Sequence, residues 1–369
     1  MIFRKRHSKK RRRVAVAMSG GVDSSLAAAL LLKKDYEVIG VTFRMWPKEE
    51  CGASFGRACC NLEAVTRARA VAGDLGIPYY VFDFSEEFKS NVIDYFCDEY
   101  LAGYTPNPCV ICNERIKFGL LRKKALALGA DLIATGHYAD KGFNRRTGRF
   151  FLKEGVDPEK DQSYFLFSLS QEQLSHALFP LSDYTKRRVR AAAKKFKLKT
   201  HNTASSQDIC FIQNLDYAEY IKKKTGVEIK EGDIVDKEGK VLGAHKGIPY
   251  YTIGQRRGLG IAYSEPLYVT DIDRSRNRVI VGLKRDVLKK SLLAHRINWM
   301  AIKDIDGQIR VKAKIRYNHK AEDATVSRVD RDLVRVDFDM PQEAPTPGQA
   351  VVFYNKGIVV GGGWIKEVV

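Results

Sequence analysis

Short apolar runs alternate with helix-like segments over residues 14–136, and this alternation constrains the fold more than any other feature of the sequence. The run VAVAM at 14–18 is typical of a buried strand, the glycine turn SGGVDSS follows it, and LAAALLLKK then has the composition of a helix. Further apolar runs at 38–43, 79–84 and 131–136 alternate with helical patterns at about 61–75, 86–102 and 114–129. Repeated units of strand and helix favour a parallel sheet covered by helices, which is an α/β fold.

The rest of the chain differs in composition and in its pattern of apolar residues. After about Gln213 the sequence is rich in glycine with short apolar runs, which predicts a small central domain at 214–284 with a long basic loop. From 285 to 369 strand patterns dominate, and in IRVKAKIRY at 309–317 apolar and basic residues alternate with a period of two. We therefore expect a basic tail at 1–13, an α/β domain at 14–213, the central domain and a C-terminal β-barrel. A length of 369 residues suits such a multidomain chain.

The chain is strongly basic. Its formal net charge is +19, and the first thirteen residues contribute eight basic side chains and no acid, so that +11 remains on residues 14–369. This charge favours a polyanionic partner, and a merely solvated basic surface is the alternative. The sequence has no apolar stretch of transmembrane length, and its first residues, MIFRKRHSKKRRR, lack the apolar segment of a secretory signal. We expect a cytoplasmic location and no membrane contact; a mitochondrial transit peptide is less favoured, because the segment is lysine-rich and short of serine.

The cysteines argue against a disulfide framework, because their number is odd and no export signal precedes them. Cys109 and Cys112 form a Cys-x-x-Cys pair within TPNPCVICNERIKFG at 105–119. That spacing fits half a zinc site, a redox pair, part of an iron–sulfur site or a catalytic thiol with a neighbour. Cys97 is expected to be a small packing residue. A zinc site is an open alternative for three cysteines in a glycine-containing stretch, which are otherwise unassigned: Cys51, Cys59 and Cys60.

The segment SGGVDSS at 19–25 stands between the first predicted strand and the first predicted helix. In that position free backbone N–H groups and the positive end of the helix dipole can hold phosphate. Gly20 and Gly21 allow close approach of the backbone, and the serine hydroxyls can donate hydrogen bonds. Asp23 would repel phosphate unless Mg²⁺ lay between them, so we assign it to the metal ion. A simple helix N-cap in a glycine turn is the alternative, and neither a Walker lysine nor G-x-G-x-x-G is present.

This segment resembles the signature of the PP-loop ATP pyrophosphatases, which cleave ATP between the α and β phosphates. Other segments resemble the tRNA-specific 2-thiouridylase family, in the same order along nearly the whole chain: TPNPCVICNERIKFG, ATGHYA at 134–139, KDQSYFLFSLSQEQL at 160–174, DICFI at 208–212, TIGQRRGLGIA at 252–262 and TPGQAVVFYN at 346–355. The resemblance implies a Rossmann-like parallel sheet with a small central domain and a C-terminal β-barrel. It implies ATP-dependent replacement of oxygen by sulfur at carbon 2 of the wobble uridine in the tRNA anticodon loop. The sulfur would come from a donor protein or from sulfide.

The resemblance also implies site residues. The ATP contacts would be Ala17, Met18, Ser19, Gly20, Gly21, Val22, Asp23, Ser24, Phe43 and Gly136, although the family commonly has methionine where Phe43 stands. Asn107, Pro108 and Cys109 would lie near the target base. Further tRNA contacts would be His137, Lys160, Asp161, Gln162, Arg316, Tyr317 and Gln349. Taken singly, His137 could be a structural histidine, Lys160 to Gln162 a solvated charge run, and Arg316 a solubilising residue.

Cys112 and Cys210 occupy the positions of the family's catalytic cysteines, Cys210 to carry a persulfide and Cys112 to attack it. Many members have aspartate where this chain has Cys109. Three thiolates converging on one pocket could ligate a [4Fe–4S] cluster, so we predict a cluster at Cys109, Cys112 and Cys210. Tetrahedral zinc and simple packing of Cys109 are the alternatives. The rival functions are an ATP pyrophosphatase acting on another base or a small molecule, and a zinc-stabilised tRNA-binding module without catalysis.

Overall fold

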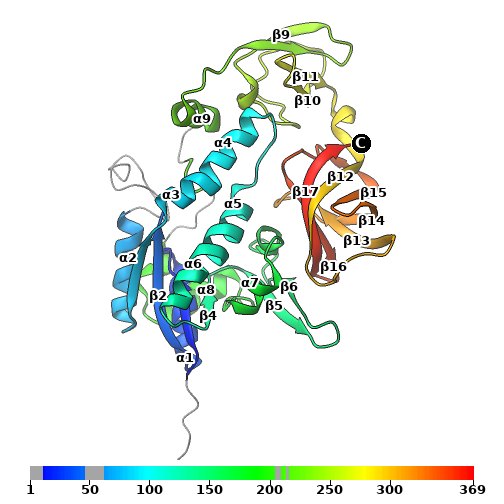
Figure 1. The fold of residues 1–369 in the computed structure, drawn as a ribbon. Helices are drawn as coiled ribbons and strands as arrows, with labels where there is room; N and C mark the ends of the chain where they lie inside the picture. The colour runs from blue at the N-terminus through cyan, green and yellow to red at the C-terminus, as the bar shows by residue number, and fades with distance from the viewer. Residues whose placement is uncertain (1–10, 46–61, 204–208, 213–215) are drawn as a thin grey trace, which may run out of the picture.

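The computed structural model describes residues 11–45, 62–203, 209–212 and 216–369 (Figure 1). They form a parallel sheet of five strands with helices on both faces, a smaller middle sheet and a C-terminal antiparallel β-barrel. The predicted fold class is confirmed. No helix in these four ranges is long and apolar enough to cross a membrane. Cys51, Cys59 and Cys60 lie outside the described residues.

The parallel sheet has the strand order β3-β2-β1-β4-β7. Its strands are β1 (Arg13–Ala17), β2 (Glu37–Arg44), β3 (Tyr79–Asp83), β4 (Leu132–Ala134) and β7 (Ala177–Leu178). Alternate residues of β1 enter different cores: Val14 and Val16 belong to one buried cluster and Ala15 to another. Both faces of the sheet are therefore covered, which explains why its strands are continuous apolar runs.

Two sets of helices cover these faces. The face of Val14 and Val16 packs against α1 (Val22–Lys33), α2 (Leu62–Asp74) and α8 (Lys186–Lys195). The opposite face packs against two longer helical segments. The first is built of α3 (Ser85–Phe88), a π-helical stretch η2 (Lys89–Ile93) and α4 (Asp94–Leu101), and the second of α5 (Pro108–Ile111), a π-helical stretch η3 (Cys112–Leu120) and α6 (Leu121–Ala127). Figure 1 shows α4 rising from this domain toward the middle sheet.

The second of these segments begins earlier than the sequence pattern predicted. It starts at Pro108 and not near residue 114, because Asn107 caps it and Pro108 fits the first helical position, where no N–H donor is needed. Cys109 and Cys112 therefore stand at the start of a helix.

The hairpin of β5 (Ala139–Asn144) and β6 (Arg149–Glu154) leaves the α/β domain and pairs with the barrel through Ile358 opposite Lys153. Arg149 strengthens the junction, since its guanidinium donates to the carbonyls of Trp299 (2.6 Å) and Met300 (3.0 Å). After the hairpin come η4 (Ser163–Leu166), α7 (Gln171–His176) and, beyond α8, η5 (Lys199–Asn202). The sequence analysis did not predict the hairpin, because it buries few side chains and its apolar run is only the three residues 150–152.

The middle sheet has the order β10-β11-β8-β9 and its own small core around Ile234, Val269 and Val281. Its elements are α9 (Tyr217–Thr225), β8 (Gly232–Val235), β9 (Val241–His245), η6 (Ile248–Tyr250), β10 (Tyr268–Asp273) and β11 (Arg278–Gly282). The barrel follows with η7 (Lys284–Val287), β12 (Leu288–Trp299), β13 (Gln308–Lys314), β14 (Glu322–Asp330), β15 (Leu333–Glu343), β16 (Ala350–Asn355) and β17 (Ile358–Val368). Strand β12 pairs with both β15 and β17, which closes the barrel.

Candidate active site

The segment 19–25 forms a tight loop before α1. Gly20 has φ +71°, and a side chain there would meet the Ala64 carbonyl oxygen at 2.4 Å, so the position requires glycine. The Gly21 carbonyl accepts from the Ser24 hydroxyl (3.2 Å) and the Ser25 hydroxyl (2.8 Å), and the Ser19 N–H donates to Ser24 Oγ (3.1 Å). Side-chain hydrogen bonds thus hold the loop open around the first turn of α1, whose N–H groups have no partners within the helix. This is the geometry of a phosphate site.

Asp23 is already paired in this structure. Lys186 Nζ lies 2.7 and 2.6 Å from the two Asp23 carboxylate oxygens, and the Tyr138 hydroxyl donates to Oδ1 at 2.6 Å. Burial and the neighbouring Asp23 carboxylate raise the pKa of Tyr138, so the phenol keeps its proton and remains a donor. The Lys186 backbone N–H donates to Asp157 at 2.7 Å, which fixes the start of α8 beside the loop.

Asp23 could supply one carboxylate to a Mg²⁺ ion. Magnesium bound to nucleotide phosphates commonly takes only one or two carboxylates from the protein, with phosphates and water completing its shell. Asp23 therefore fits the predicted role, provided that Lys186 gives up the carboxylate when nucleotide and metal arrive. Lys186 would then lie free to meet a phosphate.

Two more predicted nucleotide contacts lie close to the loop. At Gly136, which follows β4, a side chain would lie 2.8 Å from the Ser24 nitrogen and 2.9 Å from the Asp23 carbonyl carbon, so only glycine allows this approach. Phe43, on β2, is 8% exposed and packs against Phe84 with ring centroids 5.8 Å apart. Among the other predicted ATP contacts, Met18 and Val22 are buried in the core under the loop, and Ala17 is partly buried.

The predicted target-base residues lie where the barrel meets the second long helical segment. Asn107 is 7% exposed, and its side-chain oxygen accepts from the Val110 N–H at 3.4 Å. Pro108 is buried and Cys109 is exposed. Gln349, from the turn before β16, donates its amide to the carbonyls of Thr105 and Pro106, both at 3.0 Å.

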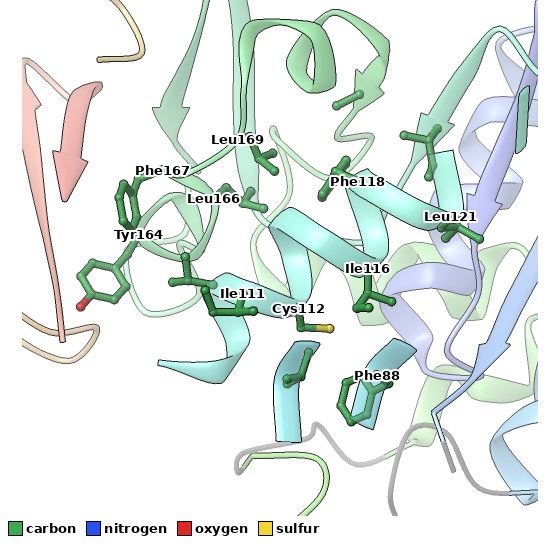
Figure 2. Close-up of a cluster of buried hydrophobic side chains, with 14 of the residues drawn as sticks. Phe88, Ile111, Cys112, Ile116, Phe118, Leu121, Tyr164, Leu166, Phe167 and Leu169 are labelled. Atoms are coloured by element: carbon green, nitrogen blue, oxygen red, sulfur yellow. The ribbon is translucent and has the colours of Figure 1, made fainter. Parts of the chain in front are cut away.

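Cys112 is 7% exposed and lies in the buried cluster between the parallel sheet and the barrel (Figure 2). Figure 2 shows it between Ile111 and Ile116, with Phe88 nearby. Cys210 is partly buried and packs against the same cluster. Its neighbour Phe211 anchors residues 209–212, with ring centroids 5.2 Å from Phe96 and 5.9 Å from Phe88. The structure therefore brings both predicted catalytic cysteines to one core.

The predicted iron–sulfur cluster at Cys109, Cys112 and Cys210 is not supported. All three residues are described, and the described part of the chain holds no group of three or more His, Cys, Asp or Glu side chains placed to bind a metal ion. Cys109 faces solvent whereas Cys112 is buried in apolar surroundings. The three residues do not fit such a group, and we assign it no step. Cys97 is buried as predicted, and this burial raises the pKa of its thiol to about 11.

Three of the predicted tRNA contacts are engaged inside the protein. His137 is buried, its Nδ1 lies 2.8 Å from Thr135 Oγ1, and burial holds its pKa well below the usual value, so the ring is neutral. Asp161 is 5% exposed and accepts from the Ser163 hydroxyl at 2.8 Å. Gln162 accepts from the Tyr138 N–H at 3.1 Å. The segment 160–162 is thus not a solvated charge run: Asp161 is buried, and Lys160 and Gln162 are partly buried.

Arg316 and Tyr317 follow β13. The Arg316 guanidinium donates to the carbonyls of Glu343 (2.6 Å) and Ala344 (2.5 Å), and burial lowers its pKa. Tyr317 packs on Phe165 with ring centroids 4.5 Å apart, and Lys314 Nζ lies 5.5 Å from the Tyr317 ring. Their role in binding RNA stays a prediction.

Sequence reasoning missed Lys186 and Tyr138 as partners of Asp23. Lys186 opens the strongly basic segment KRRVRAAAKK, where it cannot be told from solvated lysines. Tyr138 stands inside the ATGHYA segment, from which the sequence analysis predicted a role for His137 alone among the aromatic side chains. Only the fold, which places α8 beside α1, identifies them.

Comparison with known families matches the chain in three parts. Residues 12–214 match the tRNA methyl transferase HUP domain, residues 218–283 the tRNA methyl transferase PRC-barrel domain, and residues 289–365 the aminomethyltransferase beta-barrel domain.

Several curated proteins similar to this chain are tRNA-specific 2-thiouridylases. The tRNA-specific 2-thiouridylase MnmA of Clostridioides difficile (strain 630) is 49% identical over 356 residues, which are 96% of this chain and 98% of that protein. That of Moorella thermoacetica (strain ATCC 39073 / JCM 9320) is 50% identical over 353 residues, 96% of this chain and 99% of that protein. A solved 4-thiouridine synthetase–RNA complex with bound ATP is 16% identical with a TM-score of 0.37, covering 58% of this chain and 50% of that one, a likeness too low to carry an argument.

We predict that Lys186→Met lowers the rate of ATP-dependent pyrophosphate release about thirtyfold, since loss of a charge-assisted hydrogen bond costs roughly 2 kcal/mol. Asp23→Asn should abolish turnover and leave RNA binding intact. Lys195→Met, at an exposed position of the same helix, is the matched control and should keep the wild-type rate. A normal rate for Lys186→Met would show that its pair with Asp23 serves only packing.

We predict that Gly136→Ala raises the Michaelis constant for ATP at least about tenfold, because the added methyl group must push the Ser24 nitrogen and the Asp23 backbone out of the phosphate loop. Gly73→Ala is the control, because a side chain at Gly73 in α2 would meet nothing within 4 Å. Steady-state kinetics with ATP as the varied substrate make the measurement. An unchanged constant in Gly136→Ala would remove this glycine from the nucleotide site.

Proposed function

The chain belongs to the tRNA-specific 2-thiouridylase family, and from this premise we propose that it catalyses ATP-dependent 2-thiolation of the wobble uridine in the tRNA anticodon loop. Enzymatic action on tRNA with use of ATP follows from the family membership. The division of labour is our proposal: the α/β domain holds ATP and the thiols, and the basic central and barrel domains hold the RNA. We expect the enzyme to act in the cytoplasm.

In the first step the uracil oxygen at carbon 2 attacks the α-phosphorus of ATP. Pyrophosphate leaves, and AMP stays on the oxygen as a good leaving group. The loop at 19–25 would receive the departing pyrophosphate, with hydrogen bonds from the first turn of α1. Mg²⁺ held at Asp23 would neutralise phosphate charge, and Lys186 would supply a second cation.

In the second step a persulfide on Cys210, loaded by a sulfur donor protein, supplies the sulfur. Its terminal sulfur attacks carbon 2 and AMP departs, which leaves the base joined to Cys210 through a sulfur–sulfur bond. The Cys112 thiolate then attacks the Cys210 sulfur. A Cys112–Cys210 disulfide forms, the new sulfur stays on carbon 2, and a thiol reductant resets the pair. Free sulfide attacking carbon 2 directly would replace both thiol steps.

The observation that supports this assignment best is the contact of Cys210 with the buried cluster that contains Cys112. Cys97 lies in that cluster too, so the assignment of Cys112 and Cys210 rests also on their places in the family's segments TPNPCVICNERIKFG and DICFI. The base must leave its stack to reach them, which suits a single-stranded anticodon loop.

Mass analysis of nucleosides from tRNA incubated with enzyme, ATP, Mg²⁺ and a sulfur donor tests the function and the thiol roles together. Wild type should form 2-thiouridine, and Cys112→Ser and Cys210→Ser should each lower persulfide-dependent formation by at least about a hundredfold, because serine cannot exchange sulfur. Cys97→Ala, which changes a buried cysteine of the same cluster to which the proposed mechanism gives no role, is the control and should keep the wild-type rate. A wild type that releases pyrophosphate without forming 2-thiouridine would contradict the function. Full activity of either serine variant would contradict the thiol roles alone.

Binding of tRNA should weaken steeply with salt, since the logarithm of the affinity falls linearly with the logarithm of the salt concentration, with a slope proportional to the number of phosphate contacts. Strand β1 begins at Arg13, whose guanidinium donates to Glu37 at 2.7 Å, so a truncation should stop at residue 10. Removing 1–10 takes away five basic side chains and should lower affinity and the salt slope without lowering turnover at saturating tRNA. Filter binding at several salt concentrations measures the affinity for tRNA and its salt dependence, and turnover is measured in parallel. Lost turnover at saturation would give the tail a role in the chemistry.

A further inference from the structure

The segment 104–107, here called the target loop, cannot satisfy its own backbone. Pro106 and Pro108 have no N–H group, so the chain around them cannot close a turn with its own hydrogen bonds. Its carbonyl groups need donors from elsewhere, since a buried unpaired carbonyl costs free energy. Pro106 and Asn107 are both buried.

The barrel supplies those donors through the turn at 346–349. The Gln349 side-chain amide donates to the carbonyls of Thr105 and Pro106, both at 3.0 Å. In the reverse direction the Thr105 N–H donates to the Pro347 carbonyl at 3.0 Å. Gly348 lies so close that a side chain there would meet Thr105 O and Tyr104 Cβ, both at 2.9 Å. The turn and the target loop are therefore fitted to one another.

The turn itself is fixed to the barrel. The Gly348 N–H donates to the Ile365 carbonyl (2.9 Å), and the Ile365 N–H donates to the Gln349 carbonyl (2.8 Å), which ties the turn to β17. One residue further on, the Ala350 carbonyl accepts from the Tyr164 hydroxyl at 2.9 Å. A glutamine held this way presents its amide from a rigid base.

The target loop leads directly into the helix that carries the thiols. Asn107 ends the loop and caps the helix, Cys109 lies in its first turn, and Cys112 follows three residues later. A shift of the target loop would move the cap and the first turn, and with them the cysteine that must meet the sulfur donor atom. Displacements of about 1 Å at a reacting group can cost two orders of magnitude in rate.

We propose that Gln349 is a positioning residue: its amide holds the target loop, and through it the helix of Cys112, in the place that sulfur transfer requires. This inference rests on the proposed function and deepens it. The barrel then takes part in the chemical step and not only in holding RNA. Both hydrogen bonds of the Gln349 amide go to protein carbonyls, so the positioning role needs no contact with tRNA.

The test replaces Gln349 by methionine, which has nearly the same shape and no donor. The single-turnover rate of thiolation at saturating tRNA should fall roughly ten- to hundredfold, while the dissociation constant for tRNA stays within about twofold. Amide hydrogen exchange of peptides covering 104–112 should become faster. Gln342→Met is the matched control, because Gln342 is a buried barrel glutamine whose amide donates to the Met340 carbonyl, away from the target loop.

Gly348→Ala reaches the same loop by a different route and guards against a misfolded Gln349→Met. Its methyl group should displace Thr105 while the Gln349 amide remains, and it should show the same loss of rate with unchanged tRNA affinity. Gly307→Ala controls for backbone strain, since Gly307 has a similar φ (+73° against +89°) and a side chain there would meet nothing within 4 Å. If Gln349→Met fails to fold, the comparison of these two alanine variants decides.

The inference is overturned if Gln349→Met keeps the wild-type rate, or if it weakens tRNA binding and regains full rate at saturation, as a direct RNA contact would. It is also overturned if Gln342→Met loses as much rate as Gln349→Met, or if Gly307→Ala loses as much rate as Gly348→Ala. Formation of 2-thiouridine by wild type in the same assay separates these outcomes from failure of the proposed function, which would show as no product in any sample.

Discussion

One hydrophobic cluster joins the parts of this molecule, and the geometry of the site depends on it. It takes Ala15 and Ile133 from one face of the parallel sheet, Phe96 from the first long helical segment and Trp364 from the barrel. Because the hydrophobic effect is proportional to the apolar area removed from water, separating the barrel from the helices would expose a face that no other element covers. The barrel is therefore part of the core of the catalytic domain, and the Arg149 hairpin and the Gln349 turn add directional hydrogen bonds to this non-directional attachment.

A second constraint is electrostatic and acts at the other face of the sheet. The loop that we propose receives phosphates contains a carboxylate, Asp23, that would repel them. In the structure this conflict is resolved by Lys186 and by the protonated Tyr138, which together neutralise and fix the carboxylate. The pair is partly exposed, so its own contribution to stability is small, and its value lies in keeping a cation beside the loop. Phosphate and Mg²⁺ can then exchange partners with the pair, and no bare charge has to be buried.

The sequence predicted those features that depend on local pattern. Apolar runs placed four of the five parallel strands and missed only β7, which has two residues, and the period of two at 309–317 identified a barrel strand with Val311 and Ala313 inside. It failed where a contact joins distant segments. The partnership of Asp23 with Lys186 spans 163 positions, and that of Gln349 with Thr105 spans 244, and neither leaves a local signal. The cluster prediction is not supported, and spacing in sequence places Cys109 and Cys112 on one helix without saying that one faces solvent and the other the core.

That difference between Cys109 and Cys112 bears on how sulfur can travel. A persulfide is reactive toward any accessible thiol or oxidant, so a transfer site gains from excluding solvent. Cys112, at 7% exposure among Ile111, Ile116 and Phe88, has such surroundings (Figure 2). Cys109 does not, and at the solvent side of the same helix it would meet an incoming RNA or donor protein first. The helix start thus separates an outer thiol from an inner one, and the target loop, by fixing where that helix begins, sets the position from which Cys112 would attack the Cys210 sulfur in the proposed mechanism.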